Sequence, residues 1–271
     1  MTPTRIGAVS YLNTLPLVYG LRDDAGHFQL RFDVPSHCAA LLHDGAVDVG
    51  LIPSIEFLRG DYVVAPGVSI ASEGPVASVA LFARVPVESI RRVALDTSSR
   101  TSATLVRILL AERYGLAPVF EAQAPDLPAM LAGHDAALVI GDNALYADPA
   151  RLGVRKIDLG EQWTAHTGLP FVWAFWAGRA EALSPPVCEA LRASRDRGVE
   201  ACDDIAASYA AGDAHREAVA RRYFRENMKY GLDERHRAAI DRFYRSAVAV
   251  GVVPAARPVR LAGASAARAE A

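Results

Sequence analysis

Short apolar runs alternate with helical patterns along this 271-residue chain, and no other feature limits its fold as strongly. Apolar runs of strand length occupy residues 5–9, 28–34 and 47–52. Thr14 is placed to begin a helix after the first run, and Ser36 to cap a helix after the second. The resulting strand–helix–strand–helix–strand order predicts the α/β class, with a parallel sheet covered by helices on its faces.

The same pattern starts again in the middle of the chain. Residues 92–95 and 136–140 are strand-like, and the segment 101–113 between them has helical periodicity. A weak echo supports the repeat, because LxxGxxD at 42–48 and LxGxD at 131–135 each precede an apolar run. The sequence therefore predicts two similar lobes with a ligand cleft between them.

Two segments are expected to connect the lobes. A polar, proline-containing connector at 84–88 follows the strand-like runs 62–70 and 76–82, and the apolar run 171–177 returns the chain to the first lobe. From residue 184 the pattern is helical. We predict a first lobe of residues 1–84 plus 177–271, including the C-terminal helices, a second lobe of residues 85–176, and crossings near 83–91 and 169–178.

Composition excludes several classes of protein. The formal charge of −2 lacks the basic excess of a general nucleic-acid binder, and no run of about 18 apolar residues offers a membrane span. The apolar stretch after Arg5 is interrupted by polar residues and is followed by no small-residue cleavage site, so we expect a cytoplasmic protein. Cys38, Cys188 and Cys202 are too scattered for a disulfide framework or a metal site, which suits a reducing compartment.

Four loops are candidates for the ligand site, because parallel α/β sheets bind ligands at the carboxyl ends of their strands. They are SYLNT at 10–14, SEGPVAS at 72–78, SSRTS at 98–102 and TGLP at 167–170.

The loop at 98–102 is the most informative of the four. Hydroxyls and an arginine at a helix start meet unpaired N–H groups and the positive end of the helix dipole, which suits a carboxylate. The loop lacks the glycines and the lysine of a phosphate-binding P-loop. The alternative is that Ser99 or Thr101 only caps the helix, while Arg100 is solvated.

The other candidate residues also have two interpretations each. Asn13 either hydrogen bonds to a ligand or caps the following helix, and Ser78 either faces a ligand or fills a strand position. Tyr11 either stacks on a ligand ring or lines the cleft wall. Glu73 is either a base or part of a solvated turn, and Asp142 either acts in the site or caps a helix.

Patterns for metal, nicotinamide and serine-hydrolase chemistry are missing from the sequence. His37 and His43 lie six residues apart, and no HExxH motif or tight His/Asp cluster occurs. No GxGxxG follows the first strand, and no GxSxG supplies a nucleophile elbow. We therefore expect no metal site, no nicotinamide site and no serine-hydrolase nucleophile.

Six ordered segments resemble the chorismate dehydratase family of the futalosine route to menaquinone. They keep the family's order from residue 6 to about 177, whereas the helical tail resembles it only in general character. At His166 the family more often has a larger aromatic, a difference that affects the cleft wall. The segments are YLNxLPL at 11–17, GPVxS at 74–78, SRTS at 99–102, IGD at 140–142, DLGxxW at 158–163 and TGLPFV at 167–172.

The resemblance implies an α/β, two-lobed fold of the type II periplasmic-binding-protein kind, used inside the cell as an enzyme. It implies a hydro-lyase that converts chorismate to 3-[(1-carboxyvinyl)oxy]benzoate and water without a cofactor. It also implies that Asn13 and Ser78 are the catalytic residues. The expected substrate-binding residues are Tyr11, Ser99, Arg100, Thr101, Ser102, Asp142, Thr167 and Gly168.

Two other functions stay open at this point. One is a binding protein that closes on an anionic solute without chemistry, and the other is a later enzyme of the same pathway that shares the fold. The expected partner is a small molecule, with no nucleic acid and no membrane. The sequence does not determine the oligomeric state, and a homodimer is one option.

Overall fold

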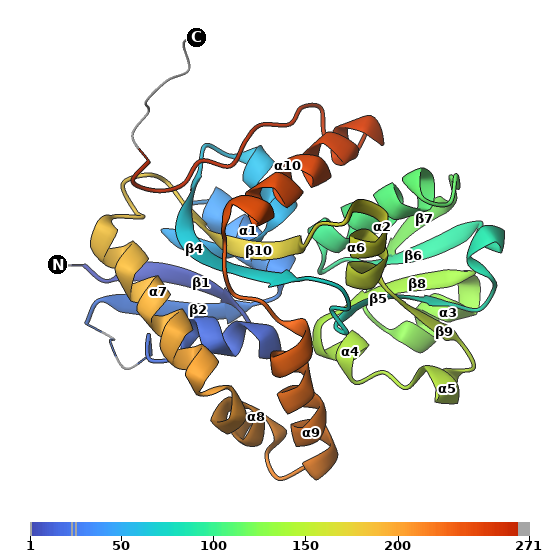
Figure 1. Ribbon diagram of the computed structural model, residues 1–271, viewed down its shortest axis with the longest axis horizontal. Coiled ribbons are helices and arrows are strands. Elements are labelled where there is room, and N and C mark those ends of the chain that lie inside the picture. The colour runs from blue at the N-terminus through green and yellow to red at the C-terminus, as the bar shows by residue number, and fades with distance from the viewer. Residues whose placement is uncertain (1, 23, 25, 265–271) are drawn as a thin grey trace.

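The computed structural model describes residues 2–22, 24 and 26–264, which form two five-stranded sheets side by side (Figure 1). The first sheet has the order β2 (Phe28–Asp33), β1 (Thr4–Val9), β3 (Val49–Pro53), β10 (Phe171–Gly178) and β4 (Val63–Ser72). The second has the order β7 (Val119–Gln123), β6 (Arg92–Asp96), β8 (Ala136–Ile140), β5 (Val79–Ala83) and β9 (Arg155–Asp158).

Both sheets are built on one plan. β1 pairs parallel with β2 and β3, and β6 pairs parallel with β7 and β8. In each sheet the fourth strand in the order runs antiparallel to both of its neighbours: β10 in the first sheet and β5 in the second. The predicted echo between the halves is thus seen in the topology, although each sheet is mixed rather than wholly parallel.

The chain crosses between the sheets earlier than the sequence predicts. β5 pairs with β8 and β9, so the first crossing is at 73–78 rather than near 83–91. β10 pairs with β3 and β4, so the second crossing is at 168–170, at the start of the expected 169–178. Both predicted lobe boundaries therefore fall one strand too late. β5 and β10 are buried along their whole length, and such a run does not show which sheet it joins.

Helices cover both sheets and continue beyond β10. Two predicted helix caps are wrong: η1 begins at Leu12, so Thr14 lies inside it, and α1 begins at Pro35, so Ser36 lies in its first turn. The helices that lie between strands are η1 (Leu12–Val18), α1 (Pro35–His43), η2 (Ser54–Arg59), η3 (Val87–Ser89), α2 (Arg100–Glu112), α3 (Leu127–Gly133), α4 (Gly141–Leu145), α5 (Pro149–Leu152) and α6 (Leu159–Thr167). Those after β10 are α7 (Pro185–Glu200), α8 (Cys202–Ala210), α9 (Ala214–Arg222), the π-helix η4 (Tyr223–Asn227) and α10 (Glu234–Ala249).

Of the C-terminal helices, α7 contacts β4 and α10 contacts β10 of the first sheet, whereas α8 and α9 pack on each other below it (Figure 1). In α10, Ile240, Phe243 and Tyr244 are buried, and their spacing places them on one face of the helix. The Phe243 ring lies 5.0 Å from that of Phe171 in β10 and 6.3 Å from that of Trp163 in α6. This aromatic cluster therefore joins α10 to both the first sheet and a helix of the second lobe. No helix in the described part of the chain is both long and apolar enough to cross a membrane.

Close packing of α7 on η1 is expected to tolerate no side chain at Gly198. A Cβ atom there would lie 2.5 Å from the Cα of Pro16. We expect Gly198→Ala to lower the free energy of unfolding by about 1–3 kcal/mol, the usual cost of overpacking. Thermal and urea unfolding measure this loss.

Gly133→Ala is the matched control for that substitution. Gly133 is also helical, but a Cβ atom there meets nothing within 4 Å, so helix propensity should make alanine neutral or stabilising by up to about 1 kcal/mol. Equal stability changes in the two variants would contradict the packing argument.

Candidate active site

A cavity lies between the lobes, at the edge where the parallel strands of both sheets end. It encloses about 60 Å³, well below the roughly 300–1,000 Å³ typical of small-molecule sites, so the lobes are closed on each other. A larger groove of about 860 Å³ runs beside α7 and η4, and it contains none of the hydroxyl or amide side chains predicted for the site. The cavity is lined by Val9, Tyr11, Asn13, Pro35, Pro53, Ile70, Val76, Ser78, Val79, Ser99, Thr101, Ser102, Ile140, Gly141, Trp173 and Ala174.

Tyr11 reaches from the first lobe to the second. A Cβ atom at Gly141, where φ is +62°, would lie 2.8 Å from the Tyr11 ring, so the ring packs directly on the glycine. The Tyr11 hydroxyl lies 3.4 Å from Ser98 Oγ, and burial raises the pKa of this phenol. Tyr11 is therefore part of the cavity wall and of the contact that closes it.

Asn13 lies inside η1, so it is not the helix cap that was one of its two interpretations. Its backbone carbonyl accepts a hydrogen bond of 3.0 Å from the Tyr230 hydroxyl. Its side-chain Oδ1 is buried and has no hydrogen-bond partner among the described residues. An unpaired buried acceptor costs about 1–3 kcal/mol, so a ligand that donates a hydrogen bond here removes that cost.

Ser78 is held at the end of the first crossing. The preceding residue, Ala77, has a φ of +60°, which is costly for a residue with a Cβ atom. The carboxylate of Asp158 compensates by accepting hydrogen bonds from the N–H groups of Val76 (3.0 Å) and Ala77 (2.6 Å). Ser78 Oγ lies 2.7 Å from the hydroxyl of Tyr223, and both residues are 2% exposed.

The start of α2 both caps a helix and lines the cavity. Ser99 Oγ accepts from the N–H of Ser102 at 3.3 Å, which is the capping role predicted as the alternative. Thr101 Oγ1 accepts from the N–H of Ile55 in the first lobe at 3.2 Å. Arg100 points to Glu56, with 3.4 Å between Nη1 and Oε1, and is not part of the cavity wall.

Three further predicted residues also lie away from the cavity wall. Asp142 accepts from the N–H of Leu12 at 3.3 Å and from the Tyr209 hydroxyl, and burial raises its pKa. Thr167 donates its hydroxyl to the carbonyl of Trp163, and Gly168 ends α6 with a φ of +71°. Asp142 therefore joins the lobes, while Thr167 and Gly168 shape the second crossing.

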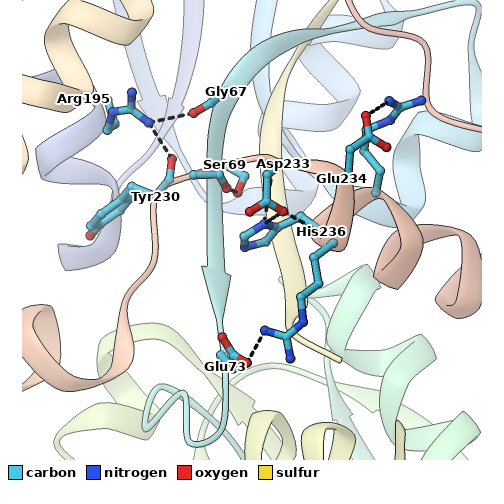
Figure 2. Close-up of polar contacts among 11 residues, drawn as sticks. Gly67, Ser69, Glu73, Arg195, Tyr230, Asp233, Glu234 and His236 are labelled. Atoms are coloured by element: carbon cyan, nitrogen blue, oxygen red, sulfur yellow. Dashed lines mark hydrogen bonds and ion pairs between the residues drawn. The ribbon is translucent and has the colours of Figure 1, made fainter. Parts of the chain in front are cut away.

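The sequence analysis also discussed Glu73 and His166 without including them among the site residues. Both make structural contacts. Glu73 pairs with Arg235, as the solvated-turn interpretation expects (Figure 2). His166 lies 3.3 Å from the carboxylate of Glu112 and does not line the cavity.

The sequence analysis missed an apolar wall and a buried support. Trp173 lines the cavity in β10, and its indole N–H donates to Ser72 Oγ at 3.1 Å. Because every residue of β10 is buried, its sequence gives no alternation that would single out this side chain. Asp96, 2% exposed, accepts from the N–H (2.8 Å) and the Oγ (2.5 Å) of Ser98, and burial raises its pKa.

The lining residues include no lysine, arginine or histidine. An anion in this cavity would be held by hydroxyls, an amide and N–H groups at the start of α2. Within residues 2–22, 24 and 26–264, no three His, Cys, Asp or Glu side chains are grouped so that they could hold a metal ion.

Closure of the cleft is expected to depend on the contact between Gly141 and Tyr11. A Cβ atom at Gly141 would press on the ring, so Gly141→Ala should hold the lobes apart. We expect a larger radius of gyration by small-angle scattering and weaker ligand binding.

Gly153→Ala is the control, because Gly153 has the same φ of +62° but meets nothing within 4 Å of an added Cβ atom. The two variants share the backbone strain and differ in the contact across the cleft. Identical scattering curves for the two would show that this contact does not set closure.

Comparison with known proteins gives the chain a family and a fold. The model of a menaquinone biosynthesis family matches residues 4–249. A chorismate dehydratase of Thermus thermophilus is 32% identical over 261 residues, which cover 90% of this chain and 94% of that protein.

Two solved structures have the same fold at low identity. Protein AF1704 of Archaeoglobus fulgidus has a TM-score of 0.70 and 19% identity, with 92% of this chain and 98% of that chain covered. A Candida albicans protein, described as having the generic periplasmic binding protein fold, has a TM-score of 0.64 and 12% identity, with 95% and 92% covered. The predicted periplasmic-binding-protein-like architecture is confirmed.

Proposed function

Because this chain belongs to the menaquinone biosynthesis family, we propose that it is a hydro-lyase that converts chorismate to 3-[(1-carboxyvinyl)oxy]benzoate and water. The proposal places the enzyme in the cytoplasm, with chorismate as its small-molecule partner and no cofactor. The observation that supports it best is one cavity that brings Asn13 and Ser78 together beside the start of α2, in a chain that is 32% identical to a chorismate dehydratase.

The reaction mainly requires the site to orient the substrate. Loss of the C4 hydroxyl and the C3 hydrogen turns the ring diene of chorismate into a benzene ring, so the product is strongly favoured. The C3 hydrogen is acidified because the diene conjugates it with the ring carboxylate. A site that fixes both carboxylates and the departing hydroxyl supplies most of what is needed.

Asn13 and Ser78 have complementary roles in this proposal. The unpaired Oδ1 of Asn13 accepts a hydrogen bond from the C4 hydroxyl and so orients it. The hydroxyl of Ser78 donates to an oxygen of the substrate on which negative charge develops. The hydroxyls and N–H groups at the start of α2 bind a carboxylate, since a helix start favours an anion.

The proton acceptor is assigned to the substrate. No aspartate, glutamate or histidine is among the residues that line the cavity. The enolpyruvyl carboxylate, attached through oxygen at C3, takes the C3 proton and passes it to the departing hydroxide, which leaves as water. Trp173, Pro53, Ile70 and Val76 form an apolar wall that excludes bulk water during this step.

The decisive experiment mixes purified protein with chorismate and follows the ultraviolet absorbance of the substituted benzoate, with the product identified by mass spectrometry. Turnover supports the proposal. Binding of chorismate without a change in its spectrum would instead identify an anion-binding protein, and turnover of a futalosine derivative alone would identify the later enzyme.

Asn13→Asp tests the role of the amide. Aspartate keeps the size of the side chain but places a negative charge beside an anionic substrate and removes the amide donor. Because aspartate matches asparagine in size, the packing around position 13 is kept and we expect the variant to fold, which its melting temperature checks. We expect kcat to fall by about 10²–10³, because the added negative charge opposes the anionic substrate and the hydroxide that departs from C4, a loss of the size that one oxyanion-hole donor supplies.

Asn143→Asp, the same change at an exposed position of α4, is the control and should leave kcat/KM within about twofold. Wild-type kcat/KM in Asn13→Asp would exclude a catalytic role for Asn13.

A further inference from the structure

The π-helix η4 brings a tyrosine from the C-terminal region to the back of Ser78. The hydroxyl of Tyr223 lies 2.7 Å from Ser78 Oγ, and the side chain is 2% exposed. Tyr223 does not line the cavity, so Ser78 separates its hydroxyl from a bound ligand. π-helical turns often occur at functional sites, and this one begins at the residue that contacts Ser78.

The segment that follows Tyr223 is fixed at two points. Asn227, the last residue of η4, donates its side-chain N–H to the carbonyl of Pro75 in the first crossing at 2.9 Å. Beyond it, Lys229 pairs with Ala71 in an antiparallel bridge beside β4.

Arg195 in α7 holds the next part of the segment against β4. Its Nη1 donates to the carbonyls of Tyr230 (3.2 Å) and Gly67 (2.7 Å) (Figure 2). The N–H of Ser69 also donates to the Tyr230 carbonyl. The position of the Tyr223 hydroxyl is therefore set by the first crossing and by β4.

The direction of the hydrogen bond follows from burial. A buried phenol that donates to nothing leaves an unpaired proton, which is costly. The Tyr223 hydroxyl lies 2.7 Å from Ser78 Oγ, a distance at which either group can donate, and it also forms a hydrogen bond with the Asn13 side chain. Because the buried Oδ1 of Asn13 accepts no hydrogen bond, the amide N–H of Asn13 is the donor in that second contact. Tyr223 must then donate to Ser78, and Ser78 keeps its own proton for another acceptor. Burial raises the pKa of Tyr223 well above its ordinary value, so the phenol keeps its proton at every physiological pH.

We propose that Tyr223 is a positioning residue of the active site: by donating to Ser78 Oγ, it directs the proton of the Ser78 hydroxyl into the cavity. The inference rests on the proposed function, in which that proton is donated to the substrate. Without Tyr223, the Ser78 hydroxyl can rotate away from the ligand, so binding and turnover lose a directed donor while the fold keeps its packing.

A double-mutant cycle with Tyr223→Phe and Ser78→Ala tests the proposal. Phenylalanine keeps the buried ring and removes the hydroxyl. We expect Tyr223→Phe to lower kcat/KM by about tenfold, the size of one hydrogen bond, and mainly through kcat. In the Ser78→Ala background the same change should cost less than about twofold, because no hydroxyl remains to be directed.

If Tyr223 had only a structural role, the double-mutant cycle would give a different result. If Tyr223 only supported the fold, Tyr223→Phe would cost the same factor in both backgrounds, and that result would overturn the proposal. So would unchanged kcat/KM in the single variant. Tyr62→Phe is the matched control, because Tyr62 is also buried and bonded, to His43 at 2.7 Å, but lies away from the cavity. It should keep wild-type activity.

Calorimetric binding of chorismate to the same four proteins separates the inference from the proposed function. If the wild type binds chorismate without turnover, the proposed function fails, and the cycle in binding affinity still decides the role of Tyr223. Coupling between Tyr223 and Ser78 in affinity supports the inference, and strictly additive losses overturn it.

Discussion

The first lobe of this molecule is completed by β10, a strand that returns to it after the whole second sheet has been formed, and the rest of the structure depends on that return. β5 enters the second sheet directly after the first crossing, and β10 enters the first sheet directly after the second. Both run antiparallel to their neighbours, so each begins at the edge where the parallel strands end. Ser78 and Trp173 therefore lie at once beside the crossings and in the cavity wall. The candidate site therefore lies at the crossings between the two lobes, and its lining comes from both of them.

The sequence predicts the fold well where the pattern distinguishes one environment from another. The strands β1, β2, β3, β6 and β8 and the helices α2 and α10 all lie where their periodicity indicates. The lobe boundaries failed because β5 and β10 are buried on both faces, and a uniformly apolar run fits either sheet equally well. Two expected helix caps failed because the chain enters both helices one or more residues earlier, without a side-chain cap.

The residues of the candidate site also fall into those that the sequence predicts correctly and those that it does not. Tyr11, Asn13, Ser78, Ser99, Thr101 and Ser102 meet in one cavity, as expected for loops at strand ends. An arginine at a helix start indicates a nearby anion, but the sequence cannot tell a ligand from a buried carboxylate, and Arg100 pairs with Glu56. Tyr223 had no signal at all, because its contact with Ser78 joins residues 145 positions apart, from a helical tail whose pattern indicates only packing.

The return of β10 to the first sheet also sets an order in which the chain can be completed during synthesis. All strands of the second sheet lie between residues 79 and 158, so that sheet is available as soon as this contiguous stretch has left the ribosome. The first sheet starts at residue 4, yet β10, at 171–178, separates β3 from β4. The lobe that is made first must therefore wait with an open sheet edge until two thirds of the protein exists. During that interval its apolar strands present an unpaired edge, which is the kind of surface that makes partly folded chains prone to aggregation.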